Sequence, residues 1–221
     1  MSASIDKAEK AALKLEAERR RLEDMKAYEK KYAGYALICG VDEAGRGPFA
    51  GPVAAGAVIL DLVSPGKEIL YLNDSKKLSE NKREQLYKEI DEKAVAWSVG
   101  LVDNHEIDEI NILQATYKAM RLAIEGLGVK PDFILADAVH IPDIDIPQEG
   151  IIKGDAKSVS IAAASIMAKV TRDRIMLEYD KLYPEYGFAS NKGYGTKAHI
   201  EALKKYGPLD IHRKTFISKY I

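Results

Sequence analysis

The sequence predicts an α/β protein in which a mixed β-sheet is flanked by helices and a further helix extends from the N-terminus. Three observations support this fold class. Short apolar segments bounded by Gly and Pro come first, helical and strand-like segments alternate after them, and residues 1–33 contain neither Gly nor Pro. A chain of 221 residues can form one sizeable domain. We therefore expect a charged helical extension over residues 1–33 and one domain over residues 34–221.

The N-terminal extension is predicted to be a long helix over residues 5–32, because strong helix formers fill it and Gly34 ends it. Its apolar stripe is thin and is interrupted by Arg19. A solvated helix is the simplest interpretation. Light packing on the domain and contact with an unidentified protein partner are the alternatives.

The domain is predicted to begin with strands and to continue with alternating helices and strands. The predicted strands cover residues 35–41, 53–60, 68–72, 94–102 and 133–136. The predicted helices cover residues 79–93, 110–127, 161–179 and 197–206. The helix from residue 161 is almost entirely apolar in its first ten residues, so we expect it to lie against the sheet.

The composition excludes several classes of protein. A net charge of -1 argues against a strongly basic, nonspecific nucleic-acid binder, although residues 186–221 carry seven Lys or Arg against two acids, which suggests one basic face. No apolar run approaches the length of a membrane helix, and the N-terminus lacks an apolar signal core. The single cysteine, Cys39, excludes an internal disulfide and fits a reducing compartment. We expect a cytoplasmic monomer.

Four carboxylates lie at predicted ends of these elements. Asp42 and Glu43 end the first apolar segment, Asp137 ends residues 133–136, and Asp155 precedes the buried helix. Asp42 and Glu43 alone would also fit an acidic turn, and Asp155 would also fit a favourable charge at a helix N-terminus. An acid after four apolar residues, as at Asp137, is costly without a partner. Because ligands bind outside the carboxyl ends of strands in open sheets, we expect one shared site.

A carboxylate cluster without cysteine or paired histidines favours Mg²⁺ or Mn²⁺ over zinc. Two such ions would stabilise the attacking and leaving oxygens of a phosphodiester hydrolysis. Gly45 and Gly47, on either side of Arg46, leave the backbone bare enough to approach a sugar-phosphate chain. The residues therefore indicate metal-dependent hydrolysis of a nucleic acid.

Six sequence blocks, in this order and spacing, resemble those of bacterial ribonuclease HII over residues 38–212. They are GVDEAGRGPFAGPV from Gly40, NDSKKLS from Asn73, ILAD ending at Asp137, KGDAKS from Lys153, AAASIMAKVTRDR from Ala162 and NKGYGTKAH from Asn191. The resemblance implies a ribonuclease H-like fold and an endonuclease that cuts the RNA strand of RNA–DNA hybrids. It also implies nicking 5′ of a single ribonucleotide embedded in duplex DNA, which leaves a 5′-phosphate and serves DNA replication and repair.

The resemblance also implies residue roles. Asp42, Glu43, Asp137 and Asp155 match the catalytic, metal-binding acids; Gly45, Arg46 and Gly47 match the reader of the 2′-hydroxyl; Tyr194 matches a tyrosine that stacks on the sugar beside the scissile bond; and Ser75, Lys76 and Lys77 match a loop near the substrate strand. A 2′-hydroxyl both donates and accepts, so exposed backbone groups suit its recognition. Arg46 and Lys153 could each hold a phosphate or brace the carboxylates.

Three other functions are less consistent with the sequence. Ribonuclease HIII, which prefers longer RNA stretches, is disfavoured by the Gly45-Arg46-Gly47 triplet and by an N-terminal region that reads as one helix. A catalytically idle binding module is disfavoured because four unneutralised acids would repel phosphate. A nucleotide hydrolase with a phosphate-binding loop is excluded, because the Gly-x-x-x-x-Gly-Lys-Ser/Thr motif does not occur.

Several other residues receive structural interpretations. Cys39 is expected to be a small buried residue, and the Arg172-Asp173-Arg174 triplet a charge cluster on a helix surface. His199 or His212 could touch phosphate in the basic C-terminal region. Members of the resembled family often carry a further C-terminal helical segment; its absence here would weaken substrate grip, which the charged N-terminal helix could restore.

Overall fold

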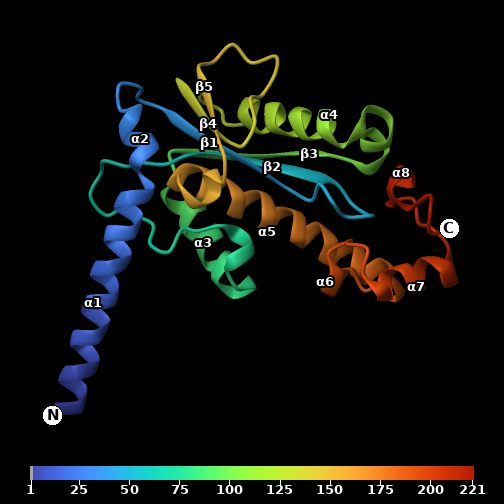
Figure 1. Ribbon diagram of the computed structural model, residues 1–221, viewed down its shortest axis with the longest axis horizontal. Coiled ribbons are helices and arrows are strands. Elements are labelled where there is room, and N and C mark those ends of the chain that lie inside the picture. Colours follow the sequence, from blue (N-terminus) through green and yellow to red (C-terminus); the bar gives the residue numbers. More distant parts are fainter. Residues whose placement is uncertain (1) are drawn as a thin grey trace.

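The computed structural model describes residues 2–221, with side chains from Glu9 onward (Figure 1). Its centre is a five-stranded sheet with the strand order β3-β2-β1-β4-β5. The strands are β1 (Ile38–Ala44), β2 (Val53–Ile59), β3 (Ala96–Val102), β4 (Phe133–Asp137) and β5 (Gln148–Ile151). The first three pair antiparallel, whereas β4 pairs parallel with both β1 and β5. The prediction of a mixed sheet flanked by helices is confirmed.

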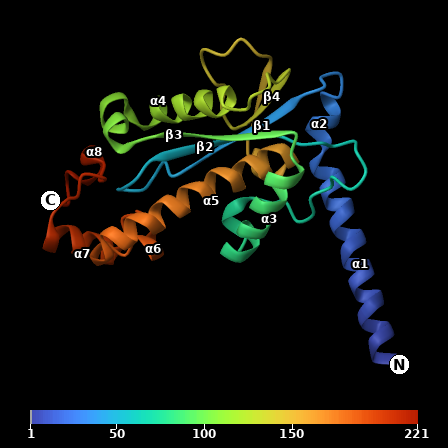
Figure 2. The ribbon, with the colours of Figure 1, turned by 180° about the vertical axis from the view of Figure 1, so that it is seen from behind.

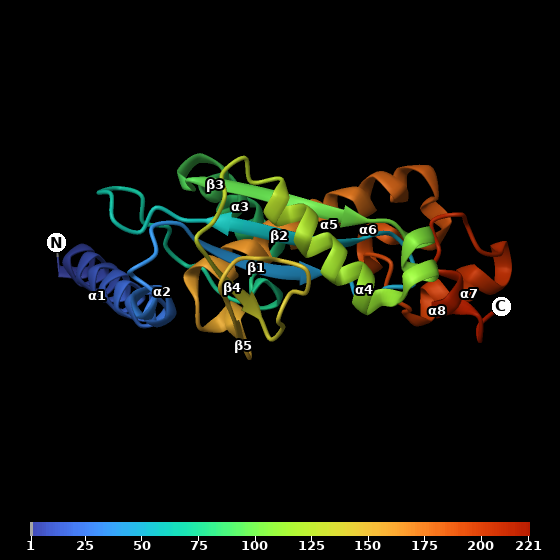
Figure 3. The same ribbon diagram turned by 90° about the horizontal axis from the view of Figure 1, so that it is seen from above.

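Helices cover both faces of this sheet (Figures 1 and 3). α4 (Asn104–Glu125) packs on one face, and α5 (Val159–Leu182) with α3 (Glu80–Lys93) packs on the other. The short helices α6 (Phe188–Asn191), α7 (Lys197–Tyr206) and α8 (Lys214–Ile217) gather at one end of the molecule, and α1 (Ser2–Met25) projects from the opposite end (Figure 2). Three 3-10 turns, η1 (Ser75–Lys77), η2 (Gly154–Ala156) and η3 (Pro184–Tyr186), complete the chain as described.

The N-terminal end of α5 lies directly against β1. A Cβ atom on Gly40 would come within 2.1 Å of the Ser160 carbonyl carbon, so only glycine allows this approach. The following alanines, Ala162 to Ala164, are fully buried and keep the helix close to the sheet. This packing fixes the turn before α5, which carries Asp155, relative to the strand that carries Asp42.

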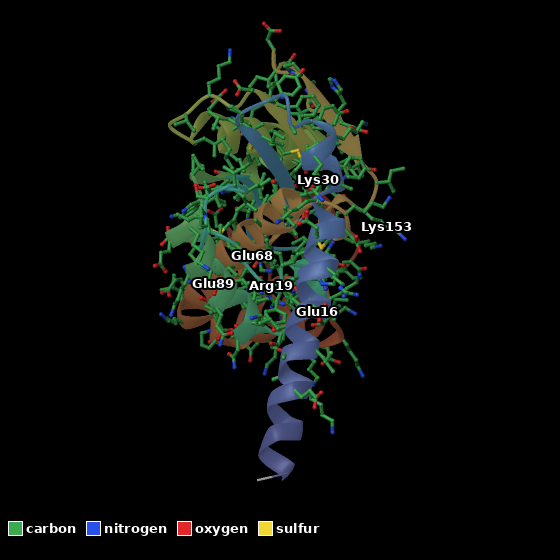
Figure 4. All side chains as sticks on the ribbon, turned by 90° about the vertical axis from the view of Figure 1, so that its left-hand side faces the viewer. Glu16, Arg19, Lys30, Glu68, Glu89 and Lys153 are labelled. Carbon is green, nitrogen blue, oxygen red and sulfur yellow. The ribbon has the colours of Figure 1, made fainter. Side chains whose placement is uncertain are left out.

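The N-terminal helix is solvated in its first part and docked in its last. Leu22 and Met25 are only 1% and 5% exposed, and a break at Lys26 leads into α2 (Ala27–Lys31). Glu29 of α2 is buried, and its Oε1 accepts hydrogen bonds from the Ser158 hydroxyl (2.6 Å) and the Ser160 amide (3.0 Å). Figure 4 shows the helix, with Glu16 and Arg19 labelled, reaching away from the body. The extension is therefore anchored at the start of α5.

One predicted strand is wrong, one strand was not predicted, and one helix begins earlier than predicted. Residues 68–72 form a loop instead of a strand: Ile69 and Leu72 are buried in the core, but Tyr71 has a φ of 69°, which a strand does not allow. β5 was not predicted, because its sequence is mostly polar and Gly, and α4 begins at Asn104, before the predicted start. None of the helices in the described part of the chain is long and apolar enough to cross a membrane.

Candidate active site

The acidic half of the site forms where β1 and β4 end side by side. In the parallel register Val41 lies opposite Ala136, so Asp42 and Asp137 follow at the same edge of the sheet. Glu43 comes next on β1. The amide of Gly154 donates a 2.7 Å hydrogen bond to Asp137 Oδ1, which draws the η2 turn and its Asp155 to this edge. Segments that are far apart in the sequence therefore converge at the four predicted acids.

Three of these carboxylates, Asp42, Glu43 and Asp155, have raised pKa values, and the charge of a neighbouring acid contributes to each. Burial and then the charge of Glu43 hold the pKa of Asp42, which is 5% exposed, well above its usual range, although the Ser165 hydroxyl opposes this shift. Burial also raises the pKa of Glu43, with Arg46 opposing and Asp137 adding. The pKa of Asp155 is raised by burial, by Asp74 and by Asp137. The cluster is an electrostatically unfavourable arrangement of acids.

The donor chemistry of this cluster fits an oxygen-preferring divalent cation, because a cation would relieve the repulsion among the carboxylates. Lys76 already lies within their field. Burial alone would lower the pKa of Lys76, but the charges of Asp42, Asp74 and Asp155 outweigh it and raise that pKa. Among the side chains from Glu9 onward, no group of three or more His, Cys, Asp or Glu is arranged so that it could hold a metal ion as it stands.

The three residues of the predicted substrate-strand loop, Ser75, Lys76 and Lys77, have different environments in the structure. Ser75 is 3% exposed and its hydroxyl lies 2.8 Å from that of Ser165, so it faces the protein and not a phosphate. Lys77 is largely exposed, 3.8 Å from Asp74. The sequence analysis did not single out Asp74, whose charge raises the pKa of Asp155. Asp74 belongs to the same sequence block as Lys76 and Lys77, which could have indicated its role.

Lys153 lies outside the group that the structure brings together. It is exposed, adopts a left-handed conformation (φ 59°) before η2, and is seen at the protein surface near α2 in Figure 4. Its assignment to phosphate binding stays a prediction.

The second half of the site is an open pocket beside Glu43. Its walls are Glu43, Ala44, Gly45, Arg46, Gly47, Lys76, Arg83, Lys169 and Tyr194. Tyr194, 44% exposed, sits next to Gly47, where an added Cβ would be 3.6 Å from its ring. Arg46 Nη1 lies 3.4 Å from Glu43 Oε1, so in this structure the arginine braces a carboxylate. The predicted glycine triplet and the predicted tyrosine therefore share one pocket next to the acids.

Two cations of this pocket, Arg83 and Lys169, were missed in the sequence. Lys169 pairs with Asp173 at 2.7 Å, and Arg83 approaches the same carboxylate at 3.9 Å. Asp173 is 6% exposed and Arg172 is 1% exposed. The interpretation of residues 172–174 as a surface charge cluster was therefore wrong for its first two members, and only Arg174, paired with Glu84, fits it.

The histidines of the C-terminal region do not face solvent. His199 and His212 are fully buried, and their Nε2 atoms lie 3.0 Å apart. The suggestion that either could touch phosphate was therefore wrong. His199 Nδ1 instead lies 3.0 Å from the carbonyl oxygen of Tyr194, which places the pair behind the tyrosine. Cys39 is buried, as expected, and burial raises the pKa of its thiol to about 12.

Solved structures with the same architecture are ribonucleases H. Ribonuclease H2 from Pyrococcus horikoshii OT3 superimposes with a TM-score of 0.67 at 30% identity, covering 83% of this chain and 96% of that one. Ribonuclease HII from Archaeoglobus fulgidus, solved in a complex with PCNA, gives 0.68 at 26% identity, covering 82% and 94%. Ribonuclease HIII solved in complex with Mn²⁺ gives 0.57 at 20% identity, covering 77% and 63%, a likeness of fold alone. The fold class is that of a ribonuclease H.

The sequence is closer still to curated bacterial relatives. It is 62% identical to ribonuclease HII of Lachnoclostridium phytofermentans, over 92% of this chain and 79% of the relative. It is 59% identical to that of Caldanaerobacter subterraneus subsp. tengcongensis, over 94% and 86%. The family model for ribonuclease HII matches residues 39–219. The chain belongs to the ribonuclease HII family, and it is accordingly a ribonuclease H, an enzyme that acts on RNA–DNA hybrids.

Proposed function

We propose that this enzyme is an endonuclease that also nicks duplex DNA 5′ of a single embedded ribonucleotide, leaving a 5′-phosphate on the ribonucleotide. The observation that supports this most is the shared pocket, in which a glycine-rich backbone and Tyr194 lie beside Glu43, one of the four proposed catalytic acids. Such a nick would begin the removal of ribonucleotides during DNA replication and repair, in the cytoplasm of the cell.

Asp42, Glu43, Asp137 and Asp155 form the proposed catalytic set. When bound, two Mg²⁺ or Mn²⁺ ions would supply Lewis-acid stabilisation of the charge that develops during phosphodiester hydrolysis. The raised pKa values of Asp42, Glu43 and Asp155 support this role, because a bound cation would offset both the burial and the mutual repulsion that raise them. Lys76, which lies among the same acids, is a proposed contact for a substrate phosphate.

Gly45, Arg46 and Gly47 form the proposed reader of the ribose. Backbone groups that no side chain covers can both donate to and accept from a 2′-hydroxyl, which a DNA sugar lacks. The Tyr194 ring, exposed across the pocket from this backbone, offers a face on which the next sugar can stack. Arg83, Lys169 and Lys77 are cations from which phosphate contacts of lower specificity are expected.

The test of this function uses two DNA duplexes that differ in one 2′-hydroxyl. Purified protein is given the duplex with one ribonucleotide and the all-DNA duplex, each with Mg²⁺, with Mn²⁺ or with a chelator. We expect cleavage of the first duplex only, and only with a divalent ion. Equal cutting of both duplexes, or cutting that survives chelation, would refute the proposal.

A further inference from the structure

Two arginines are buried beneath the pocket without an acidic partner. Arg172 on α5 is 1% exposed and Arg213, just before α8, is fully buried. In the described part of the chain, neither guanidinium lies within ion-pair distance of a carboxylate. Burying an unpaired charge costs several kcal/mol unless its donors are satisfied in another way. Here backbone carbonyl oxygens satisfy them.

Arg213 holds the two ends of the loop between β1 and β2. Its Nη2 donates to the carbonyl oxygen of Gly45 (2.7 Å) and its Nη1 to that of Arg46 (2.8 Å). Its Nε and Nη2 both donate to the carbonyl oxygen of Gly51, at 3.1 and 2.9 Å. One planar group therefore fixes the backbone of the ribose-reading triplet against the far end of its own loop.

Arg172 joins that loop to the segment that carries Tyr194. Its Nη2 and Nε donate to the carbonyl oxygens of Ala50 (3.0 Å) and Pro52 (2.9 Å), and its Nη1 donates to that of Lys192 (2.9 Å), two residues before Tyr194. The amide of Phe49 adds a 2.8 Å bond to the carbonyl oxygen of Gly193. Two segments that are more than a hundred residues apart in sequence are thus tied through one side chain.

Arg172 also packs directly against the backbone of Gly45, the first residue of the Gly45–Gly47 triplet. Gly45 has a φ of 88°, and a Cβ atom there would lie 2.0 Å from Arg172 Nε. The guanidinium therefore packs against the backbone of the triplet, with no room for a side chain between them. A lysine could keep the charge at this position, but its single ammonium cannot reproduce a fork that contacts three carbonyl groups.

We propose that Arg172 and Arg213 are positioning residues that hold the Gly45–Gly47 backbone and Tyr194 at a fixed separation, so that a ribose and the deoxyribose after it are read together. This inference rests on the proposed function above. It predicts selectivity for the junction between RNA and DNA. A uniform RNA–DNA hybrid, which has no such junction, depends less on that separation.

The test uses Arg172→Lys and Arg213→Lys, with Arg174→Lys as the matched control. Arg174 lies on the same helix as Arg172 but is exposed and paired with Glu84. The kcat/KM of each variant is measured on the single-ribonucleotide duplex and on the uniform hybrid. We expect the ratio of the two values to fall by about tenfold or more in both buried variants, because small displacements of positioned groups are costly, and to stay unchanged in the control.

The ratio separates positioning from stability. A lower fraction of folded enzyme reduces both kcat/KM values equally, so a wild-type ratio in Arg172→Lys and Arg213→Lys would overturn the inference. If the wild-type enzyme does not cut the single-ribonucleotide duplex, the proposed function itself fails, which is a different outcome.

A second measurement does not require either variant to fold. The Asp42→Asn protein is crystallised with the single-ribonucleotide duplex, and the seven hydrogen bonds from the two arginines are examined. We expect all of them to persist while Gly45–Gly47 and Tyr194 contact adjacent sugars. Loss of the Arg172–Lys192 bond with both contacts still in place would contradict the inference.

Discussion

The two halves of the proposed active site are stabilised in different ways. The acidic half, at the ends of β1 and β4, places carboxylates where burial and mutual repulsion raise their pKa values. The reading half, formed by residues 45–47 and Tyr194, rests on two arginines in which every guanidinium nitrogen donates to at least one backbone carbonyl group. The first half is therefore electrostatically strained, whereas backbone hydrogen bonds hold the second half in place. We propose that bound cations relieve the strain of the first half and that the fixed backbone of the second half provides the selectivity.

The largest expected effect comes from removing one acid. Asp42→Asn should reduce cleavage of the single-ribonucleotide duplex by about 10³-fold or more, equivalent to ~4 kcal/mol of transition-state stabilisation, and leave duplex binding measurable. Without metal, the same change should raise Tm by about 3 °C, because a buried charge under repulsion is replaced by a neutral group. Retained turnover would refute the metal role of Asp42, and a lower metal-free Tm would contradict the strain assigned to the acidic half.

In the reading half, a small substitution should lower the stability of the protein, whereas Asp42→Asn should raise it in the absence of metal. Gly45→Ala places a methyl group 2.0 Å from Arg172 Nε at a φ of 88°, so we expect a loss of about 3 kcal/mol in unfolding free energy together with most of the activity. The control is Gly47→Ala, whose methyl group meets only the edge of Tyr194 at 3.6 Å. Equal Tm values for the two variants, measured by calorimetry, would show that the loop is not fixed as described.

The two halves should also differ in their dependence on pH. Burial, and next the charge of His199, lower the pKa of His212 to about 4, and burial lowers that of His199 as well. A histidine with a depressed folded-state pKa binds its proton more readily when unfolded, so its stabilising contribution is lost as pH falls from about 6.5 towards 4. The loss should be on the order of 2 kcal/mol.

In the acidic half, the change of stability with pH has the opposite sign. The folded-state pKa values of Asp42, Glu43 and Asp155 are raised, so their repulsion is relieved as the pH falls through those values. Metal-free Tm values at pH 7.5 and 5.0 for wild type, His212→Gln and the exposed control His105→Gln separate the two contributions. Between pH 7.5 and 5.0 the Tm of His212→Gln should fall less, or rise more, than that of wild type, whereas His105→Gln should behave like wild type. If Tm changes with pH in His212→Gln as it does in wild type, the histidine pair does not contribute to the pH dependence of stability.

The smallest effect is expected where the N-terminal extension supports the acidic half. Glu29→Gln keeps the shape of the side chain but weakens its bonds to Ser158 and Ser160, so unfolding free energy should fall by about 1 kcal/mol. Glu23→Gln, an exposed change on the preceding helix, should leave the unfolding free energy unchanged. Urea titration measures both, and equal midpoints would mean that the extension is not anchored through Glu29.

The acids could be predicted from the sequence because each belongs to a local pattern. Asp42 and Asp137 follow apolar runs that become strands, and strand pairing then brings them together. Asp74 could not be found in this way, since its place depends on a loop held by the Ser75–Ser165 contact across 90 residues of sequence. Local patterns show where strands end but not which loops fold back onto them.

The burial of charged and polar side chains also could not be predicted from the sequence. Arg172 stands in a run of charged residues that is typical of a helix surface, yet its guanidinium is buried because carbonyl groups from two distant loops converge on it. His199 and His212 look like scattered polar residues, and only the fold places their rings against each other. In all three cases the partner is a distant backbone or side-chain group that leaves no periodic signal in the sequence.

If the two halves act as one site, the enzyme must cut at one fixed phosphate, and mapping the nick at single-nucleotide resolution tests this most directly. With the acids placed beside the reader, cleavage of a duplex with one ribonucleotide should occur at the phosphate on its 5′ side, and the ribonucleotide should carry the new 5′-phosphate. Cleavage at the 3′ side, or at several phosphates around the ribonucleotide, would show that the carboxylates and the ribose reader are not positioned as one unit.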